Sequence, residues 1–438
     1  MIKLTTDFDS LNKTTMTNNI LKIDYEKYSL PNGLQVILYP DLSIPVAAVN
    51  LWYRVGSANE ISGKTGFAHL FEHMMFQGSQ NVPKEGHFKF IQEAGGSLNG
   101  STSFDRTNYY ETVPANYLEL ALWLESDRMG FMLPGLNQEK LDNQKDVVMN
   151  ERRQRYENQP YGLAWEKLFS NLFSEDHPYS WPTIGWMDDI SKFELDDVKN
   201  FFQKYYSTSN ASLVIGGNFD KSNAKDLVEK YFGEIKGNNT IPEIKTSFQS
   251  LSESKKIIYE DNVQLPRIYL AWHTVKAFHE QDAVLDLLSD ILTSSKNSRL
   301  HKSLVFEKQI AQDISSFQYS GRLDGSFVIA STAKPGVTLE KIKDEIAKGI
   351  DELISKGITE NELIKAKNNI KSSYIFSLQK IDLITDHINH YNFYLNEPDS
   401  FLFDLSRYEK VTREQIIDAA QKFLTKPNTE LNIIPKKM

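Results

Sequence analysis

An internal repeat is the feature of this sequence that most constrains its fold. Three segments of the N-terminal half recur in the same order about 220 residues further along the chain. Residues 45–52 and the helix that follows them match residues 266–272 and the helix 282–295. The helix from Asn137 matches the helix from Thr359, and residues 192–220 match residues 410–436. Such a repeat predicts two homologous domains.

Local patterns predict what each domain contains. Apolar strand-like runs meet across turns such as Asn32-Gly33, and helical patterns follow them. We therefore expect an α+β fold in which each domain is a mostly antiparallel sheet with helices packed on one face. A polar stretch without periodicity lies between the two copies. The expected organisation is an N-terminal tail at 1–24, a first domain at 25–240, a linker at 241–255 and a second domain at 256–438.

Composition excludes several classes of function. The chain has 438 residues and a net charge of −9, so nucleic-acid binding has no electrostatic support. No apolar run is long enough to span a membrane. The first 24 residues show no apolar signal-peptide core, which leaves two compartments open: the cytoplasm, or the periplasm or exterior with a signal removed. The absence of cysteine excludes thiolate chemistry, so any metal must be bound by His, Asp or Glu.

The strongest motif is His69-Leu70-Phe71-Glu72-His73. On a helix, residues four apart share a face, so the two imidazoles can bind one ion. Glu72 lies near that face and can take a proton from a water molecule beside the metal without binding the metal itself. This H-x-x-E-H order is the inverse of the H-E-x-x-H motif of metalloproteases. The motif therefore predicts a zinc site with Glu72 as general base.

A catalytic zinc site has three protein ligands and one open position. No third histidine follows at a suitable spacing, and His87 and His177 are interpreted as structural residues. A carboxylate is the natural third ligand. Spacing alone does not choose among Glu111, Glu125, Glu139, Glu151 and Glu157.

Four segments together resemble the M16 metallopeptidases, a family that includes pitrilysin, insulin-degrading enzyme and the mitochondrial processing peptidase. They are the 69–73 helix, the strand ending Gly95-Gly-Ser-Leu-Asn99, the strand 107–114 and the helix segment 146–151. The two-domain length is similar to the M16B branch, and the resemblance extends from about Tyr25 over nearly the whole chain. It implies that Glu151 is the third ligand of a single zinc ion. Gln144 stands where the family often has a supporting Glu, and we expect it to hydrogen-bond a zinc ligand.

The second half of the chain departs from active single-chain members of that family. Those members carry an Arg and a Tyr, seven residues apart, that reach the substrate carbonyl. The corresponding positions here are Val305 and Gln312, and the counterparts of the two histidines are Leu285 and Ser289. The resemblance thus implies a heterodimer with a homologous M16B subunit that lacks the zinc motif and supplies the Arg/Tyr pair. A homodimer is the alternative.

Family resemblance also implies how substrate binds. The polar segment Ser97, Leu98, Asn99, Gly100 and Ser101 matches an edge strand that pairs with substrate backbone. We expect a zinc-dependent endopeptidase subunit that cleaves unfolded or extended peptides inside a closed chamber. The alternatives are a non-catalytic assembly protein of the same fold and a self-sufficient homodimeric peptidase.

Overall fold

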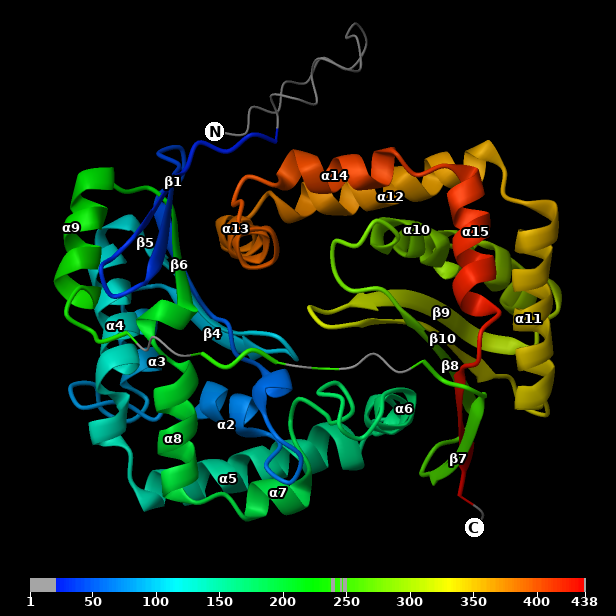
Figure 1. Cartoon of the computed structure of the whole chain (residues 1–438), viewed down its shortest axis with the longest axis horizontal. Helices are drawn as coiled ribbons and strands as arrows, with labels where there is room; N and C mark the ends of the chain where they lie inside the picture. The colour runs from blue at the N-terminus through cyan, green and yellow to red at the C-terminus, as the bar shows by residue number, and fades with distance from the viewer. Residues whose placement is uncertain (1–20, 238–240, 245, 247–249, 437–438) are drawn as a thin grey trace, which may run out of the picture. The chain divides into compact units, whose positions relative to one another are not determined.

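The computed structural model describes residues 21–237, 241–244, 246 and 250–436 (Figure 1). The expected tail at 1–24 therefore lies mostly outside the described residues. The chain forms two compact units, and neither is one continuous stretch. Unit 1 comprises 1–150, 183–244 and 375–404, and unit 2 comprises 151–182, 245–374 and 405–438. The domain boundaries expected from the repeat divide the chain into contiguous ranges, and they stay a prediction. In the structure, each compact unit also includes a segment from the other half of the sequence.

Unit 1 is built on a six-stranded sheet. Its tight turn at Asn32-Gly33 joins the first two strands, which pair antiparallel as expected. All neighbouring strands are antiparallel except β2 and β6. The strand order is β1 (Glu26–Ser29), β2 (Gln35–Pro40), β6 (Ala211–Gly217), β3 (Val46–Tyr53), β5 (Thr107–Pro114) and β4 (Ser97–Thr102).

Unit 2 repeats this topology without the first strand. Again one pair, β7 with β11, is parallel and the remaining pairs are antiparallel. The order is β7 (Lys255–Asp261), β11 (Thr429–Pro435), β8 (Arg267–Thr274), β10 (Gly325–Ala333) and β9 (Ala311–Ser320). Each strand of unit 2 thus has a counterpart in unit 1, and the predicted fold class of two related α+β domains is confirmed.

Helices pack on these sheets because their apolar faces need burial. In unit 1 they are α2 (Phe67–Met74), α3 (Gly86–Glu93), α4 (Leu118–Gly135), α5 (Gln138–Arg152), α7 (Met187–Ser191), α8 (Leu195–Tyr205), α9 (Lys221–Phe232) and α13 (Ile381–Leu395). In unit 2 they are α6 (Ala164–Leu172), α10 (Asp282–Thr293), α11 (Leu339–Lys356) and α15 (Arg413–Leu424). The divisions between the units fall inside α5, α12 (Glu360–Ser377) and α14 (Phe401–Glu409).

Helices were expected on one face of each sheet, but the sheet of unit 1 is covered on both faces, and α13 supplies the second cover. Successive residues of β3 point to opposite faces. The Trp52 indole donates to Asp386 of α13 at 3.0 Å, whereas the ring of Tyr53 packs on Tyr109 on the α4 side. A Cβ on Gly216 of β6 would lie 2.5 Å from Thr385, so the close approach of α13 needs glycine there. In Figure 1 the orange-red α13 lies beside the blue-to-green sheet.

In unit 2 the corresponding cover is α6, which comes from the N-terminal half. Trp165 of α6 packs edge-on against Tyr269 of β8, with ring centroids 5.7 Å apart. His273 of β8 contacts the Leu172 carbonyl oxygen at 2.8 Å through Nε2. The alternate β8 residues Leu270 and Trp272 point instead into the apolar core shared with α10, α11 and α15. Each unit therefore takes one helix from the other half of the sequence.

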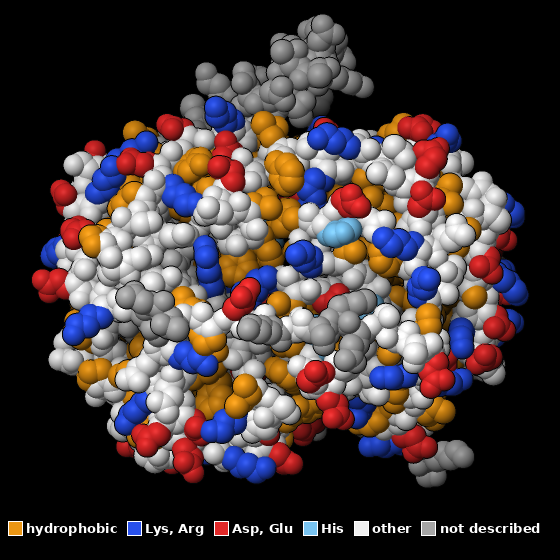
Figure 2. Space-filling model, viewed as in Figure 1, with side chains coloured by type: hydrophobic (Ala, Val, Ile, Leu, Met, Phe, Trp, Pro, Cys, Tyr) orange, Lys and Arg blue, Asp and Glu red, His pale blue; other side chains and the backbone are white. Residues whose placement is uncertain are grey.

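No helix within the described ranges has the length and apolar character needed to cross a membrane. On the face drawn in Figure 2, basic and acidic side chains are interspersed.

Candidate metal centre

Helix α2 carries the H-x-x-E-H motif, and its start is fixed by neighbouring polar groups. Gly66 precedes the helix with a φ of +100°, a conformation that favours glycine. The Glu60 carboxyl accepts hydrogen bonds from the backbone N–H groups of Gly66 and Ala68, both at 2.8 Å. Burial raises the pKa of Glu60 to about 8, although these two bonds lower it. Glu60 therefore satisfies two of the backbone N–H groups that have no partner within the first turn of α2.

The two histidines lie on one face of α2, as their spacing predicts. Their ring centroids are 4.8 Å apart at an interplanar angle of 71°, and both side chains are partly exposed. The opposite face buries Leu70, Phe71 and Met74. Packing of this apolar face thus directs His69 and His73 away from the core.

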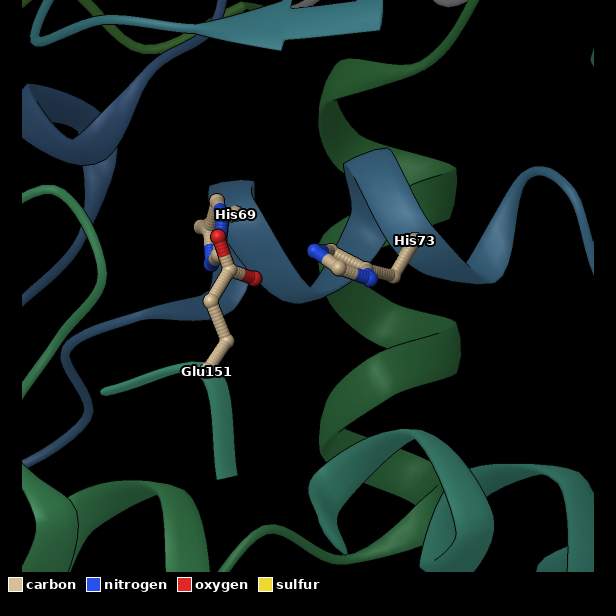
Figure 3. A group of neighbouring side chains, drawn as sticks. All are labelled: His69, His73 and Glu151. Atoms are coloured by element: carbon tan, nitrogen blue, oxygen red, sulfur yellow. The ribbon is translucent and has the colours of Figure 1, made fainter. Parts of the chain in front are cut away.

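Glu151 comes to the histidines from the last turn of α5. Most of that helix lies in unit 1, and Glu151, near its end, is the first residue of the segment 151–182. Ligand atoms of His69, His73 and Glu151 all lie within 4.8 Å of one another. Figure 3 shows the Glu151 carboxylate beside the His69 ring, with His73 further along α2. Arg155, one turn later, contacts Glu151 Oε1 at 2.7 Å.

This donor set fits zinc. Two imidazoles and one carboxylate are a common ligand combination of catalytic zinc sites. Of the five carboxylates that the sequence left open, Glu151 alone is grouped with the two histidines within the described part of the chain. Glu111 and Glu125 belong to a separate buried group with His87.

Glu72, the predicted base, faces strand β4. The Thr102 hydroxyl donates to Glu72 Oε2 at 2.6 Å. A Cβ on Gly100 would lie 3.2 Å from Glu72 Cγ, so the backbone of β4 approaches this side chain closely. Thr102 was not among the predicted residues. Its signal was the alternation of β4, because Leu98, Gly100 and Thr102 share one face of the strand.

The predicted substrate segment Ser97, Leu98, Asn99, Gly100 and Ser101 forms most of β4. This strand ends the sheet and pairs with β5 on one side, so its other edge meets no further strand of the described sheet. Ser97 and Asn99 are exposed, and the Asn99 side chain accepts a hydrogen bond from the Gly100 N–H at 2.9 Å. An open edge next to Glu72 is the geometry that adding a peptide strand requires.

Two further predicted features can be located. Gln144 is buried in α5, and its amide donates to the Asn143 side chain at 3.0 Å. Its support of a zinc ligand stays a prediction. In unit 2, Leu285 is buried in α10 and the Ser289 hydroxyl donates to the Ser316 carbonyl oxygen at 2.8 Å.

Among the residues that the structure describes in unit 2, no group of metal-binding side chains occupies that helix. The positions expected for an Arg/Tyr pair hold Val305, packed against the core, and Gln312, exposed on β9.

Comparison with known proteins agrees with this architecture. Residues 35–183 match the family model for insulinase (peptidase family M16), and residues 192–370 match the model for the peptidase M16 inactive domain. The zinc protease PqqE of Helicobacter pylori is 32% identical over 81% of this chain and 80% of that protein. The uncharacterized zinc protease YmxG of Bacillus subtilis is 26% identical over 81% of this chain and 84% of that protein.

Solved structures show the same similarity. A protease from Helicobacter pylori superposes with a TM-score of 0.89 at 28% identity, covering 94% of this chain and all of that one. An M16 inactive-domain structure from Pseudomonas fluorescens, at 20% identity and a TM-score of 0.83, shares the fold. Because the family models together match most of the chain, and PqqE exceeds 30% identity over four-fifths of it, this chain belongs to the M16 family of metallopeptidases.

Proposed function

We propose that this chain is the zinc-bearing subunit of an M16B endopeptidase that cleaves unfolded or extended peptides. The observation that carries the proposal is the grouping of His69, His73 and Glu151, with Glu72 on the same helix and an open strand edge beside it. Relatives named zinc proteases support the choice of metal.

Each residue then has a defined task. Zinc, when bound by His69, His73 and Glu151, supplies a Lewis acid that polarises the peptide carbonyl and makes water more acidic. Glu72 takes the proton of the attacking water and returns it to the leaving amine. The hydroxyl of Thr102 donates to Glu72 Oε2 at 2.6 Å and so orients the carboxylate that transfers the proton.

Strand β4 binds the substrate backbone. An extended peptide that pairs with this open edge lies next to Glu72, because Gly100 lets the Glu72 side chain approach the backbone of β4 closely. Main-chain recognition gives a loose sequence preference and excludes folded segments, which cannot offer a free strand. A chamber that closes around the peptide would strengthen this exclusion.

A homologous partner would complete the site. Val305 and Gln312 offer no side chain equivalent to the Arg/Tyr pair that stabilises the carbonyl oxygen in single-chain relatives. A second M16B subunit without the zinc motif would supply that pair. A homodimer without the pair is the competing arrangement.

Metal analysis and peptide cleavage test the zinc assignment. We expect about one zinc per chain, lost in His73→Ala and Glu151→Gln. Glu139→Gln is the matched control, because this exposed residue lies on the same helix and should keep zinc. Glu72→Gln should keep zinc and abolish cleavage of an unstructured peptide. Wild-type protein without zinc would refute the enzyme assignment and favour the non-catalytic assembly protein.

The partner is tested by assaying the purified chain alone and with a homologous M16B subunit that lacks the zinc motif. We expect cleavage to rise at least tenfold when the two are mixed, which corresponds to about 1.4 kcal/mol of transition-state stabilisation. Full activity of the chain alone would refute the heterodimer and favour the homodimeric peptidase.

A further inference from the structure

A second group of ionisable side chains is buried behind β5, away from the metal centre. It contains His87 of α3, Glu111 of β5, and Glu125 and Arg128 of α4, with exposed fractions of 2%, 1%, 0% and 2%. His87 Nε2 lies 3.5 Å from Glu111 Oε1. Arg128 donates to both oxygens of Glu125, from Nε at 2.9 Å and from Nη2. Ligand atoms of His87, Glu111 and Glu125 lie within 4.8 Å of one another.

Glu111 is the anomalous member of this group. Neither of its carboxylate oxygens accepts a hydrogen bond from an N–H or O–H group, and His87 Nε2 is likewise unpartnered. An ionised carboxylate left in this state would be strongly destabilising, because burial removes its hydration without replacing it. The buried Glu111 carboxylate therefore needs a compensating positive charge, and the candidates are a proton and a metal ion.

Charge counting separates the two candidates. Ionised Glu111 and Glu125 with Arg128 and a neutral His87 carry one net negative charge. One added proton makes the group neutral, whereas a divalent cation would leave one net positive charge next to the Arg128 guanidinium. Arg128 already engages both Glu125 oxygens and stands 4.0 Å above the Tyr109 ring. A buried excess charge is costly, so the proton is the better fit.

We propose that Glu111 and Glu125 share one proton, so that a Glu111 carboxylic acid donates a hydrogen bond to the Glu125 carboxylate that anchors Arg128. The pKa directions agree with this arrangement. Burial, together with the neighbouring Glu125 charge, raises the pKa of Glu111 well above its usual range. Burial also lowers the pKa of His87, which keeps the imidazole neutral.

The shared proton has a structural consequence for the motif helix. Arg128 covers the ring of Tyr109, whose hydroxyl donates to the Phe71 carbonyl oxygen of α2 at 3.2 Å. Glu111 and Arg128 thus act as positioning residues, because they support α2 through Tyr109. This inference concerns protonation and positioning, and it holds whether or not the chain is a peptidase.

The test compares wild type with Glu111→Gln, whose amide supplies the same donor to Glu125. Infrared spectra of the wild type near neutral pH should contain a carboxylic-acid C=O band that is absent from Glu111→Gln. The folding equilibrium constant of the wild type, relative to Glu111→Gln, should fall about tenfold per pH unit above pH 5, because only the folded wild type retains this proton. The exposed Glu93→Gln on α3 is the control and should leave the band unchanged.

The other titratable groups in and around this buried group do not disturb the comparison, because they are present in both proteins. They are His87 of α3, Glu125 and Arg128 of α4, Tyr53 of β3, Tyr109 of β5 and Glu72 of α2.

Three results would overturn the proposal. The first is a wild-type spectrum without the acid band, or a pH slope equal to that of Glu111→Gln. The second is metal analysis showing two metal ions in wild type and one in Glu111→Gln, which would make this group a metal site. The third is failure of Glu111→Gln to fold, since an amide donor should replace the acid. Unchanged metal content with loss of the band supports the shared proton.

Discussion

Replacing Asp386 tests the packing of α13 on the sheet of unit 1. Its Oδ1 accepts hydrogen bonds from Trp52 Nε1 at 3.0 Å, Asn108 Nδ2 at 3.2 Å and Asn50 Nδ2 at 3.3 Å. All three donor residues are buried. Asp386→Ala leaves these donors without the carboxylate, and each such loss costs about 1–3 kcal/mol. Because the three share one oxygen and water can reach this partly exposed position, we expect a total of about 3 kcal/mol.

Differential scanning calorimetry measures this effect. For a unit of this size, about 3 kcal/mol corresponds to a fall of about 6–9 °C in the midpoint of its transition. Asp386→Asn keeps an acceptor oxygen without the charge and should lose about half as much. Asp382→Ala, one turn earlier on α13, is the matched control and should shift the midpoint by about 2 °C or less. An Asp386→Ala midpoint equal to that of Asp382→Ala would refute the reasoning.

Three further predictions follow from individual contacts. Gly100→Val should reduce kcat/KM at least tenfold with zinc retained, because the new side chain meets Glu72 Cγ at 3.2 Å; unchanged cleavage would contradict this. Thr102→Val should lower kcat/KM about tenfold through loss of the hydrogen bond to Glu72, and Thr102→Ser should restore it. Burial raises the pKa of Asp324 to about 6, so the folded protein keeps this proton longer than the unfolded chain. The free energy of unfolding should therefore fall by about 2–3 kcal/mol relative to Asp324→Asn between about pH 4 and 6, as urea titrations would show, and a constant difference would exclude this.

The sequence predicted both sheets because strand patterns and turns are local signals. The exchanged helices were not predicted, since an amphipathic helix shows that one face needs burial without showing which sheet provides it. Helix α13 makes this plain: its buried face includes the polar residues Asn389 and Asn392, which hydrogen-bond Asn50 and Ser212 of the first sheet. The burial of these two polar side chains is explained only by their hydrogen bonds to the first sheet.

The residues of the candidate metal centre likewise differ in whether the sequence alone could predict them. His69 and His73 are four residues apart on one helix, so spacing alone indicated a shared face. Glu151 lies on another helix, and only family resemblance selected it from five carboxylates. Glu111 and Glu125 were open alternatives as zinc ligands, but strand β5 and helix α4 bring them to each other and to Arg128. Contacts between separate elements depend on packing that no local pattern encodes.

Because α6 and α13 each pack on the sheet formed by the other half of the sequence, the two sequence halves are not interchangeable modules. A chimaera joined within 241–255 would lay a foreign helix on each native sheet: a donor's α13 would meet Gly216, and this chain's α6 would meet the donor's β8. Recombination between relatives is therefore constrained by two helix–sheet contacts that lie far from the junction. Substitutions in each sheet are therefore expected to correlate, among relatives, with substitutions in the distant helix that packs on it.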